Sequence, residues 1–566
     1  MAHQRPRTPH RHLDASRRRF LRTSLAGGTA LLGSGLGLGT LLPVPAIAAA
    51  SDPIWIERTI PELHRLMASG ALTSRELTRG YLNRIAQFNP LLHAVIETNP
   101  QAEAIAEQRD NQRRAGHGLP GSLHGIPVLV KDNIATDDLM QTTAGSLALV
   151  GSKVPKDADL IARLRAAGAV ILGKANLGEW ANFRGFNPLG FYGWSARGGA
   201  THNPYLLDYT AFGSSSGSAV SVVANLCSAA VGTETDGSLV SPSNANLAVG
   251  LKPTLGLISQ AGIIPVSHEQ DTAGPIGRTV TDVAIMLGVL QSPTSVIEGH
   301  PPPATYTQFL RRGALSGARI GVDLRFFDDY ADYGYPGDDD TLPFVQQALN
   351  AMQSLGATLV PTDTGDIFAY ADDEFTALLY EFKVHIADYL SRLRQSPHRG
   401  LADLIAFNLA NCPTEMPYFG QELFEMADST SGDLTDPVYL AARAAARTSA
   451  RSGIDNALAT GDLDAIVAPH LSNSTAAAVA GYPNLALPVG ITPAGKPAGL
   501  MMYSTFLQEP ALIGFAYDLE QELNVRRQPG FLGTVNDPPL AGLCASAQAP
   551  RGPTGNASLR QGRIAI

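Results

Sequence analysis

The stretch from Gly213 to Thr254 constrains the fold of this chain more than any other part. It reads GSSSGSAVSVVANLCSAAVGTETDGSLVSPSNANLAVGLKPT, and two Gly/Ser clusters, residues 213–218 and 232–238, bracket an apolar segment of helical length, Ala219–Val231. We therefore expect two tight turns joined by a helix. Glycine tolerates positive φ, so successive N–H groups in such turns can converge into the anion-binding nest that an oxyanion needs. A flexible tether is also rich in Gly and Ser, but it would not enclose an apolar helix.

A second feature is an apolar run that ends in a lysine. Gly125–Asn133 reads GIPVLVKDN, so that Val128, Leu129 and Val130 lead directly into Lys131. An all-apolar run of this kind predicts a strand buried on both faces. Side chains at the carboxyl ends of such strands lie where α/β sheets place ligand sites. Most lysines are solvated surface groups, so a lysine that continues a buried strand is a candidate for chemistry.

Both features resemble the amidase signature family of serine hydrolases. The family pattern is a G-I-P-x-x-x-K-D-N block, a GGSS-type turn, a helix, and a second turn, GT-acid-x-G-G-S, that runs through a proline into G-L-K-P-T. The resemblance implies an α/β fold with a central mixed, mostly parallel β-sheet, helices on both faces of the sheet and a helical insertion. It also implies a non-proline cis peptide bond at Ser214. The matching residues are Gly125–Asn133, Gly213–Gly217, Gly232–Ser238, Pro242 and Gly250–Thr254.

The resemblance further implies a Ser-Ser-Lys triad. Ser238 would attack an amide carbonyl, Ser214 would relay its proton, and neutral Lys131 would accept that proton, because serine is a poor nucleophile until a neighbour deprotonates it. Burial can lower the pKa of a lysine by several units, which this role requires. Neither a cofactor nor a metal takes part in this chemistry. The oxyanion hole would consist of the backbone N–H groups of Thr235, Asp236, Gly237 and Ser238.

Within the family, the segments around Trp180 and Trp194 look most like the peptide amidase branch, whose members hydrolyse the C-terminal carboxamides of peptides. Many relatives carry an arginine two or three positions after the nucleophile, where this chain has Val240 and Ser241, so a small dicarboxylic monoamide is a poor candidate. Fatty acid and aryl amides are alternative substrates. Packing alone would also explain the tryptophans, and the acid before the second turn's glycine could bind a substrate N–H or cap the turn. The candidate substrate contacts are Asp236, Trp194 and Ser215.

Composition and charge narrow the class of protein. Hydrophobic residues make up 44% and charged residues 16% of the 566 residues, which is typical of a globular protein with a large core. The first 48 residues contain seven Arg and one Asp, so without them the net formal charge changes from −9 to −15. No basic patch follows, so this balance argues against a nucleic-acid partner. A small-molecule or peptide amide is the binding partner that the resemblance implies.

The three cysteines are Cys227, Cys412 and Cys544. They are far apart and lack metal-type spacing, so neither a disulfide framework nor a zinc site is indicated. One pair could still form in an oxidising compartment.

The N-terminal segment resembles a twin-arginine export signal. Ser16–Arg22 places adjacent arginines before Phe-Leu, Leu25–Leu42 is an apolar run loosened by glycines, and residues 46–50 offer an A-x-A cleavage pattern. A membrane-spanning helix is the weaker interpretation, because the run is short and rich in glycine. We expect residues 1–50 to direct export, to the periplasm or out of the cell, with no stable membrane association after signal removal. The sequence does not indicate an oligomeric state.

The rest of the chain is expected to form a single catalytic domain, residues 51–544. Within it, residues 366–458 have a mainly helical pattern, interrupted by Pro413 and Pro417, and are expected to form an insertion that covers one side of the site. Residues 545–566 are rich in Gly, Pro, Ser and Arg and are expected to be a disordered tail.

Four local patterns predict particular elements of that domain. Thr73–Glu76 reads as a capping box at the start of a helix, and residues 169–172 read as a strand. Residues 271–275, DTAGP, read as a turn, and the helix after this turn is expected to be capped near Thr279 and to end at Leu290.

Three other classes of protein fit parts of the sequence. Gly213–Gly217 also satisfies G-x-S-x-G, which would make Ser215 the nucleophile and require a later histidine such as His268 or His470. No apolar strand runs directly into Gly213, which weakens this interpretation. An exported binding protein that kept an old hydrolase fold is the non-enzymatic alternative. A tRNA-linked amidotransferase subunit shares the family pattern, but such subunits work in the cytoplasm with partners, and the N-terminal segment argues for export.

Overall fold

The computed structural model describes most of the predicted catalytic domain. The described residues are 52–116, 123–292, 297, 301–328, 338–470 and 473–545. The predicted export signal lies outside them, and so does the predicted tail beyond its first residue. Residues Trp55–Ile566 form one compact unit, to which all the elements below belong.

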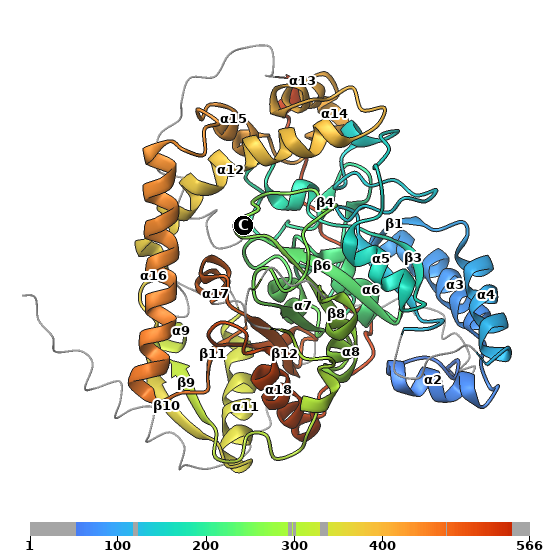
Figure 1. The fold of residues 1–566 in the computed structure, drawn as a ribbon, viewed down its shortest axis with the longest axis vertical. Coiled ribbons are helices and arrows are strands. Elements are labelled where there is room, and N and C mark those ends of the chain that lie inside the picture. The colour runs from blue at the N-terminus through green and yellow to red at the C-terminus, as the bar shows by residue number, and fades with distance from the viewer. Residues whose placement is uncertain are drawn as a thin grey trace, which may run out of the picture. The chain divides into compact units, whose positions relative to one another are not determined.

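Eleven strands of the described residues form one mixed β-sheet (Figure 1). A separate two-stranded hairpin consists of β4 (Trp194–Ser195) and β5 (Gly199–Ala200). In order across the large sheet, the strands are β1 (Val95–Thr98), β3 (Val170–Ala175), β2 (Pro127–Lys131), β6 (Ala229–Glu234), β8 (Thr272–Gly277), β7 (Val249–Lys252), β12 (Asn484–Ile491), β13 (Pro497–Tyr503), β11 (Ala465–Pro469), β9 (Arg319–Asp323) and β10 (Thr358–Thr362).

Strand direction varies across this sheet. β2 pairs in parallel with β3 and β6, and β9 pairs in parallel with β10 and β11. The pairs between these two blocks, from β6 through β8, β7, β12 and β13 to β11, are antiparallel, as is the pair of β1 with β3. The predicted α/β class with a mixed central sheet is confirmed. The sheet is not mostly parallel, because four of its ten strand pairs are parallel and six are antiparallel.

Sixteen α-helices of the described residues flank the sheet on both faces or form the insertion (Figure 1). None of the described helices combines the length and apolar character that a membrane span requires. The helices are α2 (Ile60–Ala68), α3 (Ser74–Leu92), α4 (Ala102–Arg114), α5 (Asp159–Ala166), α6 (Ser216–Val223), α7 (Val240–Ala245), α8 (Val280–Leu290), α9 (Arg325–Asp328), α11 (Leu342–Ser354), α12 (Ala371–Arg392), α13 (Leu401–Ala410), α14 (Cys412–Glu415), α15 (Glu422–Asp428), α16 (Pro437–Gly461), α17 (Thr475–Ala480) and α18 (Glu509–Leu523).

Several predicted elements are confirmed. β2 is buried along its whole length and ends at Lys131. Thr73 and Glu76 form a reciprocal capping box at the start of α3. The side chain of Thr279 caps α8, which ends at Leu290 as expected. The strand predicted at residues 169–172 is β3, which continues further, to Ala175.

The predicted helix over Ala219–Val231 is wrong in its second half. α6 ends at Val223, Asn225 adopts a left-handed conformation with φ of 55°, and the chain re-enters the sheet as β6 at Ala229. Every residue of this segment is buried. A fully buried apolar run carries no periodicity that separates helix from strand, so the two turns are joined by a helix and a strand.

The turn predicted at residues 271–275 is also wrong. Thr272–Gly277 is β8, a strand that pairs with β6 on one side and β7 on the other. Close packing of the strand accounts for the glycine, because a Cβ atom at Gly274 would lie 2.1 Å from the carbonyl oxygen of Leu251. Glycine in a strand often marks such a close approach.

Residues 366–458 have the helical character expected of the insertion. They contain α12 to α15 and most of α16, and α12 packs against α15 and α16 (Figure 1). A disulfide bond joins Cys412, at the start of α14, to Cys544 near the end of the described chain. Cys227 is buried and free. The disulfide therefore ties the insertion to the C-terminal segment.

We expect the disulfide to stabilise the native state, because it closes a loop between residues 132 positions apart. The variant Cys544→Ser should lose about 2–4 kcal/mol of unfolding free energy. The measurement is urea unfolding with and without a reductant, with Cys227→Ala as the control that should keep its sensitivity to the reductant. Identical unfolding of Cys544→Ser and the parent chain, or three titratable thiols in the unreduced parent, would contradict this prediction.

Candidate active site

Lys131 lies at the centre of a polar cluster built from β2, β6 and the turn before α6. Its Nζ atom lies 2.7 Å from Ser214 Oγ, 3.0 Å from Ser215 Oγ, and 2.9 and 3.0 Å from the hydroxyl and carbonyl oxygens of Thr233. The side chain is fully buried. The structure thus brings together Lys131 and Ser214, two of the three predicted catalytic residues.

Burial lowers the pKa of Lys131 to about 7. Removal of water disfavours the charged ammonium, while the carboxyl groups of Asp271 and Glu234 act in the opposite direction with smaller effect. A substantial fraction of this lysine is therefore neutral near pH 7.

The hydrogen-bond partners suit a neutral amine. Ser215 Oγ donates to Thr233 O at 3.0 Å and so can accept a hydrogen from Lys131, and Thr233 O can accept only. An uncharged amine that donates to these two acceptors keeps its lone pair for a hydroxyl group. The hydroxyls of Ser214 and Thr233 both lie within reach of that lone pair.

Ser215 also joins the two turns to each other. Its hydroxyl accepts from Thr233 N at 3.2 Å, and its backbone N–H donates to Ser238 O at 2.9 Å. The residue is fully buried. These contacts place Ser215 as a support for Lys131 and for the second turn, rather than at the surface where a substrate would meet it.

Ser238 lies in the second turn with 2% of its surface exposed. Its Oγ atom has no hydrogen-bond partner within the part of the chain that the structure describes. The Lys131–Ser214 contact of the predicted relay is therefore present, whereas Ser214 and Ser238 are not hydrogen bonded through their hydroxyl groups. The peptide bond between Gly213 and Ser214 is cis, as the family resemblance implies.

The carboxylate of Glu234 shapes the turn that carries Ser238. One of its oxygens accepts from the backbone N–H groups of Leu239 at 2.9 Å and Val240 at 3.0 Å. Gly237 has φ of +70°, a conformation that side chains rarely adopt. The turn is therefore closed on itself around a buried acid. The oxyanion role of Thr235, Asp236, Gly237 and Ser238 stays a prediction.

Asp236 binds the start of α17. Its two carboxylate oxygens accept from Ser474 Oγ at 3.0 Å and from Thr475 Oγ1 at 2.7 Å. Burial, together with the neighbouring Glu374, raises the pKa of Asp236 well above its usual value. These contacts tie the second turn to α17, and the role of Asp236 in binding a substrate N–H stays a prediction.

Trp194 is packed rather than exposed. Its ring contacts the rings of Tyr418 and Phe419 edge-on, with centroids 5.7 and 5.6 Å away, and lies 5.3 Å from the guanidinium carbon of Arg184. Only 6% of its surface is exposed. The packing interpretation of this tryptophan fits these contacts.

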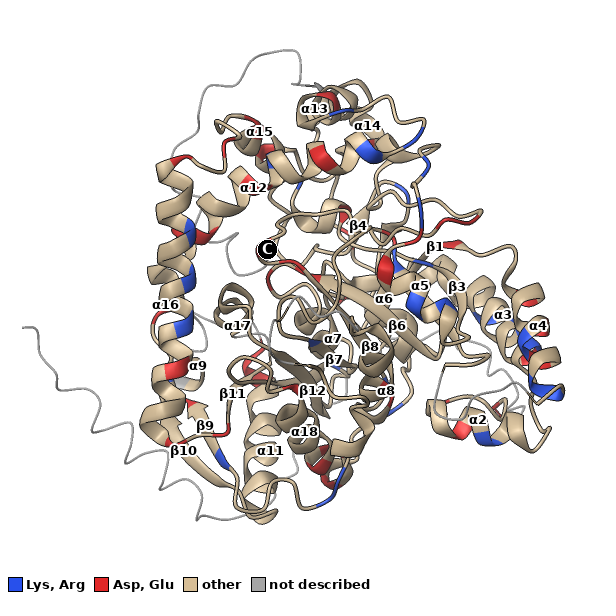
Figure 2. Cartoon of the chain, in the orientation of Figure 1, with Lys and Arg blue, Asp and Glu red and all other residues tan. Residues whose placement is uncertain are grey.

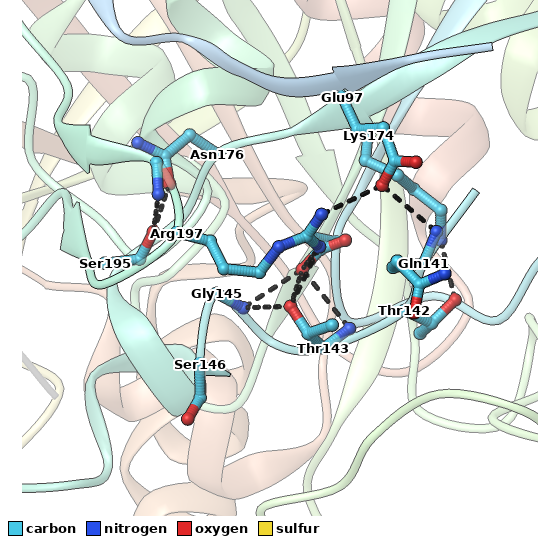
Figure 3. A network of polar contacts seen from close by, with 12 residues as sticks. Glu97, Gln141, Thr142, Thr143, Gly145, Ser146, Lys174, Asn176, Ser195 and Arg197 are labelled. Carbon is cyan, nitrogen blue, oxygen red and sulfur yellow. Dashed lines mark hydrogen bonds and ion pairs between the residues drawn. The ribbon is translucent and has the colours of Figure 1, made fainter. Parts of the chain in front are cut away.

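A polar network beside Lys131 fixes the end of β2 (Figure 3). Asp132 accepts from the hydroxyl of Thr143 at 2.5 Å and from Gly145 N at 3.0 Å. Arg197 lies 3.6 Å from Asp132 and also binds Glu97 at 2.9 Å, as Figure 3 shows for the Glu97 contact. Sequence reasoning noted Asp132 only as a neighbour of the lysine and did not identify Arg197 or Thr143.

The two histidines that an alternative hydrolase would need lie elsewhere. His470 contacts Tyr209 OH and Gly499 N through its ring nitrogens, at 3.2 Å each, and His268 contacts Gln260 and the ring of His385. Since the hydroxyl of Ser215 binds Lys131 and Thr233, the G-x-S-x-G interpretation is wrong.

Within the described residues, no group of three or more His, Cys, Asp or Glu side chains is placed to hold a metal ion.

Comparison with known proteins identifies the family. The sequence profile of the Amidase family matches residues 76–477. The chain belongs to this family. It is an amide-hydrolysing enzyme of the amidase signature type, so the non-enzymatic alternative is excluded.

Relatives of this amidase resemble it over most of its length. A probable amidase of Arabidopsis thaliana is 40% identical over 490 residues, which cover 84% of this chain and 92% of the relative. A putative amidase of Schizosaccharomyces pombe is 36% identical over 517 residues, which cover 84% of this chain and 87% of the relative. The crystal structure of the peptide amidase from Stenotrophomonas maltophilia is 45% identical, has a TM-score of 0.78, and covers 84% of this chain and 99% of its own.

We expect the activity of this amidase to depend on the ionisation of Lys131. Because its pKa is lowered to about 7, the amine is neutral above that pH and charged below it. The value of kcat/KM for an amide substrate should fall about tenfold per pH unit below pH 7 and level off above it. A profile that is flat from pH 5 to 9, or that rises only near pH 10, would contradict this prediction.

Proposed function

We propose that this amidase hydrolyses primary carboxamides to the acid and ammonia, with the C-terminal amides of peptides as substrates, through a Ser-Ser-Lys triad. The observation that carries this proposal is the buried amine of Lys131, 2.7 Å from Ser214 Oγ and linked through Ser215 to the turn of Ser238.

In the proposed first step, Ser238 Oγ attacks the carbonyl carbon of the substrate. Its proton passes to Ser214 while the proton of Ser214 passes to Lys131, so the amine ends the step charged. This requires the hydroxyl of Ser238 to turn towards Ser214 when substrate is bound. The negative charge on the tetrahedral oxygen would be stabilised by N–H groups of the turn, by about 3–4 kcal/mol per donor.

In the second step, the carbon–nitrogen bond breaks. The proton on Lys131 returns along the same path to the departing nitrogen, which leaves as ammonia, and an acyl-enzyme remains on Ser238. Water then attacks the acyl carbon, and its proton passes along the relay to Lys131. The bond between the acyl carbon and Ser238 Oγ breaks, and the same proton returns to Ser238, so the acid is released and the lysine is neutral again for the next turnover.

The proposed substrate class rests on the similarity of this chain to a peptide amidase and on one residue position at which it departs from many members of the family. The peptide amidase of Stenotrophomonas maltophilia is 45% identical to this chain. A structure of a peptide amidase in complex with the competitive inhibitor chymostatin is similar to this chain at the same identity. Val240 and Ser241 offer no cation for a substrate carboxylate. A fatty acid or aryl amide is the alternative substrate.

We also propose that residues 1–50 direct the enzyme out of the cytoplasm, to the periplasm or outside the cell. The resemblance to a twin-arginine signal supports this. The Cys412–Cys544 disulfide gives further support, because disulfides persist in oxidising compartments.

Single substitutions test the triad. Ser238→Ala should lower kcat/KM by roughly four orders of magnitude or more, because no other group forms the acyl-enzyme. Ser215→Ala, which removes only a support, should keep measurable activity, about 10- to 100-fold below the parent. A fluorophosphonate probe should label the parent at Ser238. Labelling elsewhere, or full activity of Ser238→Ala, would refute the triad.

A substrate panel tests the specificity. We expect kcat/KM for peptide C-terminal amides to exceed that for fatty acid amides, aryl anilides and short aliphatic amides by about tenfold or more. Release of ammonia or amine is the measurement for each substrate. A strong preference for fatty acid amides would overturn the peptide assignment and leave the family unchanged.

A further inference from the structure

Two side chains from outside the predicted oxyanion turn bind its first residue, Thr235. Its carbonyl oxygen accepts from Gln270 Nε2 at 3.1 Å, and its hydroxyl donates to Asp271 Oδ1 at 2.6 Å. Gln270 and Asp271 are consecutive residues just before β8, and they are 2% and 7% exposed. The position of the turn therefore depends on this buried loop.

The loop has its own internal support. The second carboxylate oxygen of Asp271 accepts from the backbone N–H groups of Val266 at 2.8 Å and Ser267 at 2.9 Å. One acid thus closes the loop and binds the turn at the same time.

The side chain of Gln270 is oriented by a residue of the insertion. Arg443, on α16, donates from Nη1 to Gln270 Oε1 at 2.9 Å. Arginine has donors only, so the oxygen of the Gln270 amide must face Arg443 and its NH₂ group must face the carbonyl of Thr235. The same NH₂ group donates to Glu374 Oε1, on α12, at 2.6 Å.

Arg443 is itself fixed by a buried ion pair. Its Nε and Nη2 atoms lie 2.8 and 2.7 Å from the two carboxylate oxygens of Glu381 on α12. The hydroxyl groups of Tyr439 and Ser267 also donate to Glu381. A two-point arginine–carboxylate contact sets the plane of the guanidinium group, so Arg443 can present its remaining N–H groups in one direction only.

The neighbouring arginines of α16 have different partners. Arg443, Arg447 and Arg451 are spaced by four residues and lie on one face of the helix, which carries its basic residues in the middle of its length (Figure 2). Arg447 binds Glu269 and Arg451 binds the carbonyl of Ala480. Of these three arginines, Arg443 is the one that contacts Gln270.

We propose that Arg443 and Gln270 are positioning residues, through which α12 and α16 of the insertion hold the oxyanion turn in its working geometry. This rests on the proposed function, since the turn matters for rate only if it faces the oxyanion formed at Ser238. An oxyanion hole stabilises charge because its donors are already in place, and a displacement of about 1 Å can lower a rate about 100-fold. The insertion is therefore part of the catalytic apparatus.

The test compares variants along this chain of contacts. Gln270→Leu and Arg443→Met should each lower kcat about 10- to 100-fold, with KM changed by less than about threefold. The rate of fluorophosphonate labelling at Ser238 should fall in parallel. Gln270→Glu keeps an acceptor for Arg443 and loses the donor to Thr235 and to Glu374, so it should show the same loss of kcat.

Lys383→Met is the matched control. Lys383 lies on α12, as do Glu374 and Glu381. Its amine binds the backbone carbonyls of Asp428 and Thr430 within the insertion and does not contact the oxyanion turn. Its loss should lower the Tm and leave kcat of the folded enzyme unchanged. If kcat in the Gln270 variants is unchanged, or falls only with the folded fraction as in Lys383→Met, the positioning role is wrong.

Two further outcomes separate this proposal from the proposed function. Full activity of Ser238→Ala would remove the proposed function itself. An inactive Ser238→Ala together with a fully active Gln270→Leu would remove the positioning role alone.

Arg443→Met leaves Glu381 as an unpaired buried charge and can fail to fold for that reason. The two Gln270 variants leave that ion pair intact, so they decide the matter.

Discussion

The amine of Lys131 has to stay uncharged inside a sheet, and the rest of the site depends on this requirement. A lysine pKa lowered from 10.5 to about 7 corresponds to about 5 kcal/mol of preference for the neutral form. This preference works against folding: as the pH falls from 10.5 to 7, the unfolded lysine gains a proton that the folded one does not, and stability is lost across that range. Favourable packing in the rest of the protein must offset this loss of folding stability.

Burial disfavours the charged form of the acids around the lysine as well. Asp271 and Glu234 are buried. Burial raises the pKa of Asp271 to about 7 and raises the pKa of Glu234 as well. Their negative charges would raise the pKa of the lysine, but the effect of its burial is larger. Both acids also accept hydrogen bonds: Glu234 closes the turn of Ser238, and Asp271 closes the loop that holds Thr235. The site thus uses its buried acids as structural parts of the two segments beside the amine.

Much of this arrangement could be predicted from short motifs. The apolar run before Lys131 predicted a buried strand, and the two Gly/Ser clusters predicted the turns that meet it. The boundaries inside Ala219–Val231 could not be predicted, because burial on all sides removes the periodicity that separates helix from strand. The strand at Gly274 and Pro275 could not be predicted either, and these two residues suggested a turn. The sequence cannot show that a neighbouring strand comes close enough to exclude a side chain at position 274. The supports provided by Gln270 and Arg443 lie 173 residues apart in the chain, and only the packing of the insertion brings them together.

The most direct measurement is the titration of Lys131 itself. In protein labelled with ¹³C at the lysine ε carbon, its resonance can be assigned by comparison with Lys131→Met and followed from pH 5 to 11. A midpoint near 7 is the result that this account predicts, because the amine is desolvated and bound by neutral acceptors. A midpoint near 10.5 would mean that the amine is charged at the pH of catalysis and could not accept a proton from Ser214.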